Sequence, residues 1–157
     1  MKRSQLALPT YDARLTDVKI TPKCLSTKIS YKLKLYDETL ERSVNRKMCF
    51  EDVAAIAFLM NYFDSPIGAE ACGFYEIFEK DMKIKLLENN FISRRERFLF
   101  HGDYNYEPDE PHDLLNYREI IESVMEEIDQ YHLYEQQTTG GTYLILAKRW
   151  RMECVKH

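Results

Sequence analysis

The clearest alternation of apolar and polar positions in the chain runs from Ser26 to Tyr36. Apolar side chains alternate there with a polar, largely basic set: Ile29, Tyr31, Leu33 and Leu35 against Ser30, Lys32, Lys34 and Tyr36. Because successive side chains of a strand point to opposite faces, this pattern predicts a strand with one buried face and one basic face. Asp37–Thr39 has the composition of a turn, so we interpret Leu40–Phe50 as the return strand of a hairpin.

A helix is predicted for residues 113–129. Its apolar residues recur at the three- and four-residue steps of one buried stripe: Leu114, Leu115, Tyr117, Ile120, Ile121, Val124, Met125 and Ile128. Acidic residues lie at similar steps between them and should line the opposite, exposed face. After the helix, residues 131–137 and 142–150 flank a glycine-containing turn at 138–141, which is typical of a β-hairpin.

The middle of the chain is harder to interpret. Residues 51–63 are predicted to form a helix that is apolar nearly all round and begins with two acids, which suit the positive end of a helix dipole. Residues 69–82 fit either a helix or, at 73–78, a strand, and the structure of 69–90 stays open. Residues 91–101 are predicted to form a strand, and 102–112, with two prolines, a loop.

These elements predict an α+β fold: a single domain over residues 1–157, with an antiparallel β-sheet packed against two or three helices and a C-terminal helix followed by a β-hairpin. Residues 1–15 should form a loose N-terminal arm or a short edge piece, Val18–Ile20 should begin a strand that ends at Pro22, and 152–157 should form a tail. Nine apolar residues are expected in the core: Leu33, Leu35, Ile56, Leu59, Phe78, Ile121, Val124, Leu144 and Leu146.

Composition adds limits on the class of protein. No apolar run approaches the roughly 18 residues that span a membrane, and the first ten residues lack the apolar core of a secretion signal. The four cysteines are widely spaced, which argues against a zinc knuckle: Cys24, Cys49, Cys72 and Cys154. Their number permits two disulfides, but buried free thiols are the simpler expectation. We therefore expect a soluble, cytoplasmic protein that does not contact a membrane.

The net charge of −4 conceals a gradient along the chain. Residues 1–50 hold 11 Lys and Arg against 5 Asp and Glu, residues 51–100 hold 6 against 9, and residues 101–157 hold 5 against 12. This distribution argues against a uniformly basic nucleic-acid-binding protein. An acidic C-terminal third is instead suited to a basic partner.

Nine of these acids lie between residues 107 and 129, against the single base Arg118. Like charges at helical spacing cost about a few tenths of a kcal/mol per pair, and a basic partner would relieve that repulsion. Two tyrosines in the adjoining loop are expected to act as rigid anchors. The predicted partner-binding set is Tyr104, Tyr106, Glu107, Asp109, Glu110, Glu119, Glu122, Glu126 and Asp129. The alternatives are a solvated acidic helix without a partner, and self-association through the basic strands of a second copy.

Two other sets of residues suggest different chemistry. Carboxylates and imidazoles in the 101–113 loop are of the types that bind a divalent metal in a hydrolase: His101, Asp103, Glu107, Asp109, Glu110, His112 and Asp113. Their spacing fits neither a twelve-residue calcium loop nor paired histidines on a helix, so a solvated loop is the simpler interpretation. His132 and Glu135 are suited to proton transfer, but strand geometry directs them to opposite faces. We therefore assign no catalytic residue, metal or cofactor.

The third hypothesis is a nucleic-acid-binding accessory protein. Basic residues on the predicted strands would contact phosphates, with Tyr31 or Tyr36 stacking on bases: Lys32, Lys34, Arg94, Arg95 and Arg97. The chain lacks the aromatic signature of an RNA-recognition sheet, and charge runs on strands are usually solvated. Both observations argue against this function.

The leading interpretation is a non-enzymatic protein that binds a basic protein through its acidic loop and helix. In size and charge the chain is similar to small acidic bacterial inhibitors such as toxin-immunity proteins. That similarity implies an inhibitor that masks a basic nuclease or its substrate site, and it rests on charge and size rather than on a motif.

Overall fold

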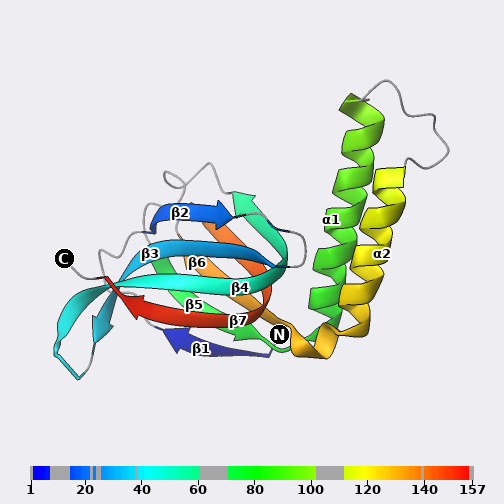
Figure 1. The fold of residues 1–157 in the computed structure, drawn as a ribbon. Coiled ribbons are helices and arrows are strands. Elements are labelled where there is room, and N and C mark those ends of the chain that lie inside the picture. The colour runs from blue at the N-terminus through cyan, green and yellow to red at the C-terminus, as the bar shows by residue number, and fades with distance from the viewer. Residues whose placement is uncertain are drawn as a thin grey trace. The chain divides into compact units, whose positions relative to one another are not determined.

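The structure is a computed structural model that describes residues 2–7, 15–21, 23, 26–37, 39–60, 71–101, 112–138 and 140–155, without the side chains of 7, 60, 71–72, 91–101 and 112–117. The strands are β1 (Arg3–Ala7), β2 (Thr16–Thr21), β3 (Thr27–Asp37), β4 (Arg42–Met60), β5 (Ala71–Ile77), β6 (His132–Thr138) and β7 (Gly141–Cys154) (Figure 1). The helices are α1 (Lys80–His101), α2 (His112–Glu126) and the short 3₁₀ helix η1 (Ile128–Gln130). The chain divides into two compact units, a sheet unit of residues 1–79 and 131–157 and a helical unit of residues 80–130.

The predicted fold class is wrong. Most of the described chain forms one seven-stranded antiparallel sheet with the order β1-β5-β6-β7-β4-β3-β2, accompanied by two helices, and not a sheet packed against two or three helices. β6 and β7 pair with each other across the predicted turn at 138–141, but they are inner strands of this sheet, between β5 and β4, and not a hairpin appended to a C-terminal helix. Whether the two compact units make up one domain stays a prediction.

The main error concerns residues 51–63. β4 continues for 19 residues, from Arg42 to Met60, and its second half pairs with β7 up to Met60 opposite Gly141. An apolar run of this length fits a buried helix or a buried strand equally well, so the distant partner strand decides the outcome. The ring of Phe58 stacks on Tyr143 of β7 with centroids 4.1 Å apart, a contact that a helix at 51–63 would not make.

The first hairpin is confirmed. β3 buries Ile29, Tyr31, Leu33 and Leu35 and exposes the basic row between them, as the alternation predicts. It pairs with β4 from Asp37 opposite Arg42 to Thr27 opposite Val53, and β2 pairs with β3 on the other side. The Asp37 carboxylate accepts the backbone N–H groups of Thr39 and Leu40 at 3.0 and 3.1 Å, which fixes the turn.

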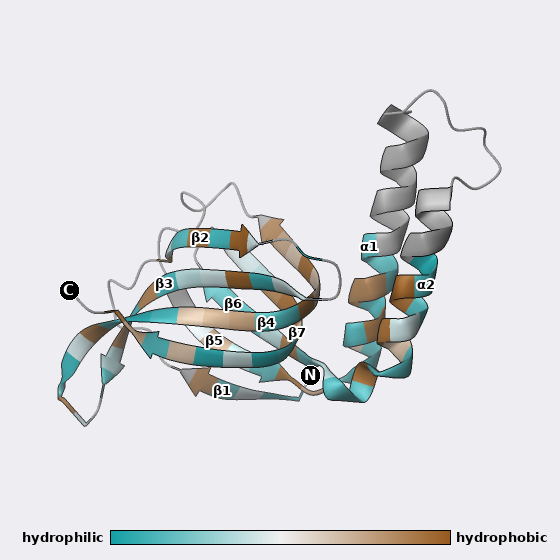
Figure 2. Ribbon diagram, in the orientation of Figure 1, coloured by the Kyte–Doolittle hydropathy of each residue, from teal (hydrophilic) through white to brown (hydrophobic). Residues whose placement is uncertain are grey.

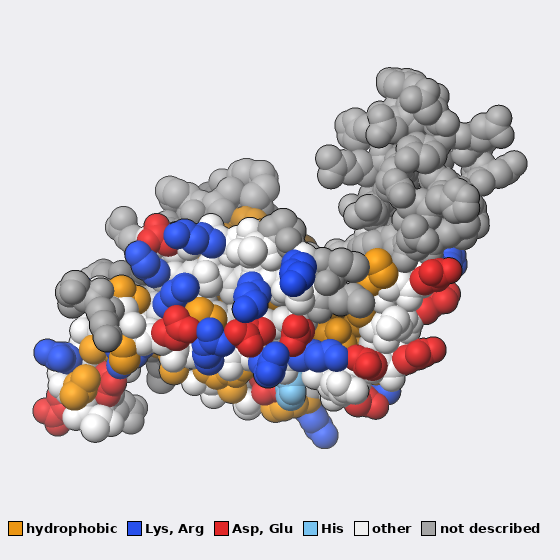
Figure 3. All heavy atoms as spheres, in the orientation of Figure 1, with side chains coloured by type: hydrophobic (Ala, Val, Ile, Leu, Met, Phe, Trp, Pro, Cys, Tyr) orange, Lys and Arg blue, Asp and Glu red, His pale blue; other side chains and the backbone are white. Residues whose placement is uncertain are grey.

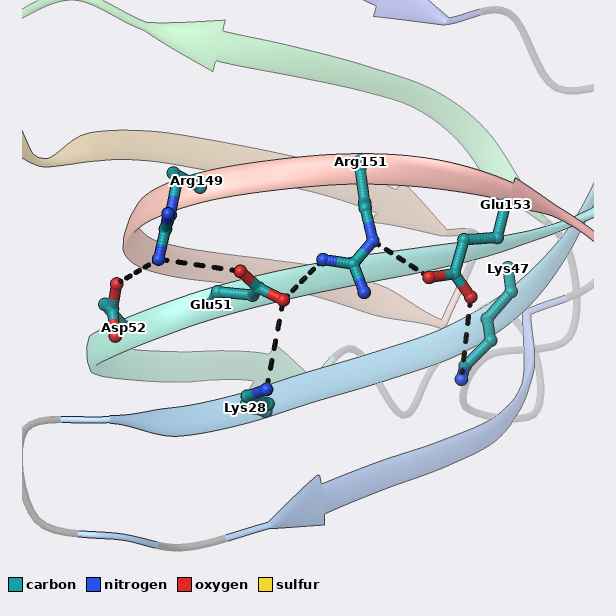
Figure 4. A network of polar contacts seen from close by, with 7 residues as sticks. All are labelled: Lys28, Lys47, Glu51, Asp52, Arg149, Arg151 and Glu153. Carbon is teal, nitrogen blue, oxygen red and sulfur yellow. Dashed lines mark hydrogen bonds and ion pairs between the residues drawn. The ribbon is translucent and has the colours of Figure 1, made fainter.

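β4 and β7 both bend strongly, so that the sheet folds over (Figure 1), and Asp52 lies at the bend of β4 (Figure 4). Asp52 has a φ of 53°, and it lies in the part of β4 between Phe50 and Val53 where the register with β3 shifts, so β4 has here a β-bulge of the kind that bends strands. The bend turns the side of the sheet formed by β2 and β3 toward the side formed by β5 and β6. Phe50 of β4 then meets Phe74 of β5 and Tyr134 of β6, with ring centroids 6.0 and 5.5 Å apart.

One buried polar group lies within this aromatic core. Gln136 is fully buried, and its side-chain oxygen accepts a hydrogen bond from the hydroxyl of Tyr31 at 3.0 Å. Its amide nitrogen donates to the backbone oxygens of Gly73 at 3.0 Å and Gln137 at 3.1 Å, next to the irregular pairing between Ala71 and Gly73. These contacts use both of its amide hydrogens, so the group does not carry the cost of an unpaired buried amide.

In the helical unit, α1 continues to His101, so the strand predicted for residues 91–101 is wrong. Residues 71–77 form a strand and 80–90 form a helix, which settles the segment that the sequence leaves open. Five of the described apolar side chains of this unit are buried: Leu86, Leu87, Ile121, Val124 and Ile128. Figure 2 shows hydrophobic and hydrophilic residues alternating along the described turns of both helices.

The expected core is only partly correct. Leu33, Leu35, Ile121, Val124 and Leu146 are buried, whereas Ile56 and Leu144 are half-buried. Leu59 is 61% exposed because it belongs to a strand and not to an all-apolar helix, and Phe78, 53% exposed, lies in the connection after β5.

At the chain ends, β1 forms an edge strand within the expected N-terminal arm, and β7 takes in Met152–Cys154 of the expected tail. Among the described residues, no helix is both long enough and apolar enough to cross a membrane.

Candidate functional site

The acidic face of the helical unit consists of Glu119, Glu122 and Glu126 of α2 and Asp129 of η1, all exposed. These residues belong to the predicted partner-binding set. Ile121, Val124 and Ile128 between them are buried, so the three- and four-residue spacing directs the acids to solvent. Figure 3 shows acidic side chains over the described turns of α2.

Few cations neutralise this face. Residues 118–130 contain five acids and one base, Arg118. Lys80 of α1 lies 3.0 Å from Asp129, whose side chain is 83% exposed, while Glu119, Glu122 and Glu126 make no ion pair with a described residue. The last turn of α2 has no basic residue. Because the C-terminal end of a helix carries partial negative charge, acids without bases there are unfavourable for the isolated helix.

The rest of the predicted set lies outside the described residues: Tyr104, Tyr106, Glu107, Asp109 and Glu110. The proposed metal loop also falls there, apart from the backbone of its ends, where His101 closes α1 and His112 and Asp113 open α2. Among the side chains that are described, no group of three or more histidine, cysteine, aspartate or glutamate residues could hold a metal ion.

A second charged surface lies on the sheet unit. The charged face is the outer side of β2, β3, β4 and the end of β7, where Figure 3 shows lysine and arginine gathered with acids between them. It carries seven basic and four acidic residues: Lys19, Lys28, Lys32, Lys34, Lys47, Arg149 and Arg151, with Asp17, Glu51, Asp52 and Glu153. The sequence predicts the lysine row of β3, but the acids that share the face come from other strands.

Most of these charges form one network of ion pairs (Figure 4). Glu51 contacts Arg151, Arg149 at 3.6 Å and Lys28 at 3.9 Å. Arg149 also lies 2.9 Å from Asp52 at the bend. Glu153 lies 2.8 Å from Arg151 and 3.9 Å from Lys47. The hydrogen bond from Arg151 is the largest cause of a lowered pKa at both Glu51 and Glu153. The network therefore connects β3, β4 and β7 across their outer side.

Lys34 and Lys19 differ from the other cations of the charged face. Neither makes an ion pair with a described acid, whereas Lys32, next to Lys34 in the same row, lies 2.6 Å from Asp17. Tyr36, in the same row, is 51% exposed. Tyr31 is buried and cannot stack on a base, so that part of the nucleic-acid hypothesis is wrong. Arg94, Arg95 and Arg97 belong to α1 and not to a strand of this sheet.

His132 finds a carboxylate that the sequence does not reveal. Its Nδ1 lies 2.5 Å from Oε1 of Glu76 on β5, and its ring stacks on Tyr134 with centroids 6.0 Å apart. Burial raises the pKa of Tyr134, and the negative charge of Glu76 adds to that rise. Glu135 contacts Arg3 and Gln137 instead, as opposite strand faces require. Glu76 lies opposite Tyr134, two residues along β6 from His132, so only the pairing of β5 with β6 places Glu76 beside this histidine.

A carboxylate bonded to Nδ1 fixes the orientation of an imidazole, which is one requirement of a general base. This contact joins only two residues, whereas the acidic face presents four exposed acids of the predicted partner-binding set, so the acidic face is the stronger candidate for function. No protein-family profile, curated protein or solved structure matches this chain.

Proposed function

We propose that this chain is a small, non-enzymatic interaction protein that binds a basic protein partner through its acidic face. One observation carries the proposal: Glu119, Glu122 and Glu126 are exposed without an ion pair to any described residue, on a helix whose last turn has no base. The isolated helix thus keeps a repulsion that lysine or arginine side chains of a partner would remove. The same charge would steer a basic partner toward this face.

The proposal extends to the loop that precedes α2. Tyr104, Tyr106, Glu107, Asp109 and Glu110 would continue the surface with two aromatic anchors and three further acids. A protein of this kind acts as an immunity-type inhibitor if the covered basic surface is an active site. We place it in the cytoplasm, and the free thiols of Cys49 and Cys154 are compatible with that compartment.

Purification of the tagged protein from its native cells at moderate salt tests the proposal. Wild type should retain a basic protein at constant stoichiometry, and Glu122→Lys with Glu126→Lys should lose it, because the variant repels the cations of the partner. The matched control is Glu41→Lys with Glu88→Lys, which changes the net charge equally at two exposed positions outside the acidic face.

The control should keep the partner, and both variants should melt cooperatively near the wild-type temperature. Equal retention by wild type and the Glu122 and Glu126 variant would remove the acidic face from the interaction. Equal loss in both variants would show that only net charge matters.

A further inference from the structure

The two units of the chain differ in charge. The sheet unit carries 15 Lys and Arg against 13 Asp and Glu, and the helical unit carries 7 against 13. Within the sheet unit the positive excess lies on the charged face, with seven bases against four acids. One chain therefore presents both a basic surface and the acidic surface that would complement it.

We infer that the charged face is a docking surface for the acidic face of a second copy of this chain. This inference shares the acidic face with the proposed function and assigns a partner to the other, basic surface. Association of this kind is heterologous, because different surfaces of the two copies meet. Each added copy leaves one free charged face and one free acidic face, so the assembly grows with concentration.

The spacing of charges on the two surfaces is compatible. Lys32 and Lys34 are two residues apart on β3, which places them about 7 Å apart along the strand. Lys47 lies opposite Lys32 on β4, about 5 Å away. On α2, acids three and four residues apart are separated by about 4.5–6 Å along the helix axis. A helix lying along this part of the sheet can thus bring several carboxylates to these three lysines together.

The existing ion pairs of the charged face do not prevent this docking. Lys32 and Lys47 remain 47% and 43% exposed in their pairs with Asp17 and Glu153, and exposed pairs contribute only about 0–1 kcal/mol each. Exchanging such a partner costs little, and Lys34 has no described acid to give up. The charged face has three more basic than acidic residues, and this net positive charge attracts the acidic face of a second copy.

A copy whose acidic face is docked on a neighbour cannot bind the basic partner of the proposed function. Self-association would therefore hold the protein in reserve, and a partner with higher affinity for the acidic face would release single copies from the assembly.

Complementation between two variants tests this inference by sedimentation velocity. One variant is Glu119→Gln, Glu122→Gln and Glu126→Gln, and the other is Lys32→Gln, Lys34→Gln and Lys47→Gln. Glutamine removes a charge without reversing it, so neither variant gains a new surface that attracts one of the existing surfaces. At about 50 mM salt, wild type should associate in a concentration-dependent manner, and each variant alone should need at least tenfold higher concentration.

An equimolar mixture of the two variants should form a dimer that does not grow, because each molecule keeps only one of the two surfaces. That dimer would also show that both variants are folded. About 0.5 M salt should dissociate every species, since screening at that ionic strength acts over a few ångströms. Lys34→Gln alone, which breaks no described ion pair, should show a smaller loss in the same direction.

Two results would overturn the inference. One is a wild type that stays monomeric at low salt, whether or not it binds a single-stranded oligonucleotide, and the other is a mixture of the two variants without dimer. Failure of the proposed function gives a different pattern. In that case wild type still associates with itself, but purification from native cells recovers the same proteins with wild type as with the Glu122→Lys, Glu126→Lys variant.

Discussion

Asp52 holds the backbone conformation on which the bend of the sheet depends. Its φ of 53° is in the left-handed region, which costs a residue with a β-carbon about 1–2 kcal/mol, less for aspartate and asparagine, whose side chains bond locally. The ion pair from Arg149 acts on the same residue, but that arginine is well exposed, so its contribution is small.

Substitutions at Asp52 therefore distinguish the effect of its backbone conformation on stability from the effect of its charge. Asp52→Asn should change the free energy of unfolding by less than about 1 kcal/mol, whereas Asp52→Val should lower it by about 1–2 kcal/mol more than Asn does. Asp52→Gly should be at least as stable as the Asn variant. Urea unfolding measures all three, and equal stability of the Val and Asn variants would contradict this account of the bend.

Tyr31 and Gln136 form a polar contact inside an aromatic core. Tyr31→Phe should lower stability by about 1–2 kcal/mol, because it leaves the Gln136 oxygen without its described hydrogen-bond donor while keeping the ring. Leu33→Ala, on the same buried row, should cost about 2–5 kcal/mol by leaving a cavity. Thermal and urea unfolding would measure both, and a Tyr31→Phe variant as stable as wild type would show that the hydroxyl is not needed.

Burial also predicts how stability depends on pH. Burial is the largest cause of a raised pKa at Tyr31, so the folded protein keeps this phenol protonated above pH 10, where the unfolded chain ionises. The unfolded state then binds fewer protons than the folded state, so stability is full below about pH 10 and falls as the pH rises above it. Unfolding measured between pH 8 and 11 should show this fall, reduced in Tyr31→Phe. An identical pH dependence in wild type and the variant would refute it.

At the scale of elements, the sequence predicts the strands and helices that have one apolar and one polar face. β3 has a buried and a basic face, and its alternation identifies both. Residues 51–60 show no such contrast, and whether they form a helix or a strand depends on pairing with β7, which starts more than 80 residues later. Glu76 and His132 belong together for the same reason, since β5 and β6 meet only in the folded sheet. The acids of α2 could be predicted because helical periodicity alone exposes them.

The C-terminal end of α2 should show a conflict between stability and binding. Glu126→Lys places a positive charge near the negative end of the helix and removes a repulsion, so it should raise the free energy of unfolding by about 0.3–1 kcal/mol. The same change should weaken binding of a basic partner. Glu88→Lys on α1 is the control for a charge reversal away from the acidic face. A destabilised Glu126→Lys variant would show that Glu126 has a structural role.

At the scale of the whole molecule, charge is separated between the two compact units, and this separation is the basis of both the proposed partner and the proposed self-association. The gradient is visible in the amino-acid composition along the chain. Composition does not reveal that the acids of the charged face are taken up in ion pairs across β3, β4 and β7, whereas Glu119, Glu122 and Glu126 have no described cation. That difference follows from strand register, which brings distant residues together.

The most direct test is the dissociation constant of the purified complex with the basic partner, measured for wild type, for Glu122→Lys with Glu126→Lys, and for Glu41→Lys with Glu88→Lys. If each reversed charge costs about 1.4 kcal/mol of binding, the first variant should bind about 100-fold more weakly. The control should stay within about threefold of wild type, because its charges lie outside the interface. The same dissociation constant for wild type and the Glu122 and Glu126 variant would contradict the assignment of the acidic face as the binding site.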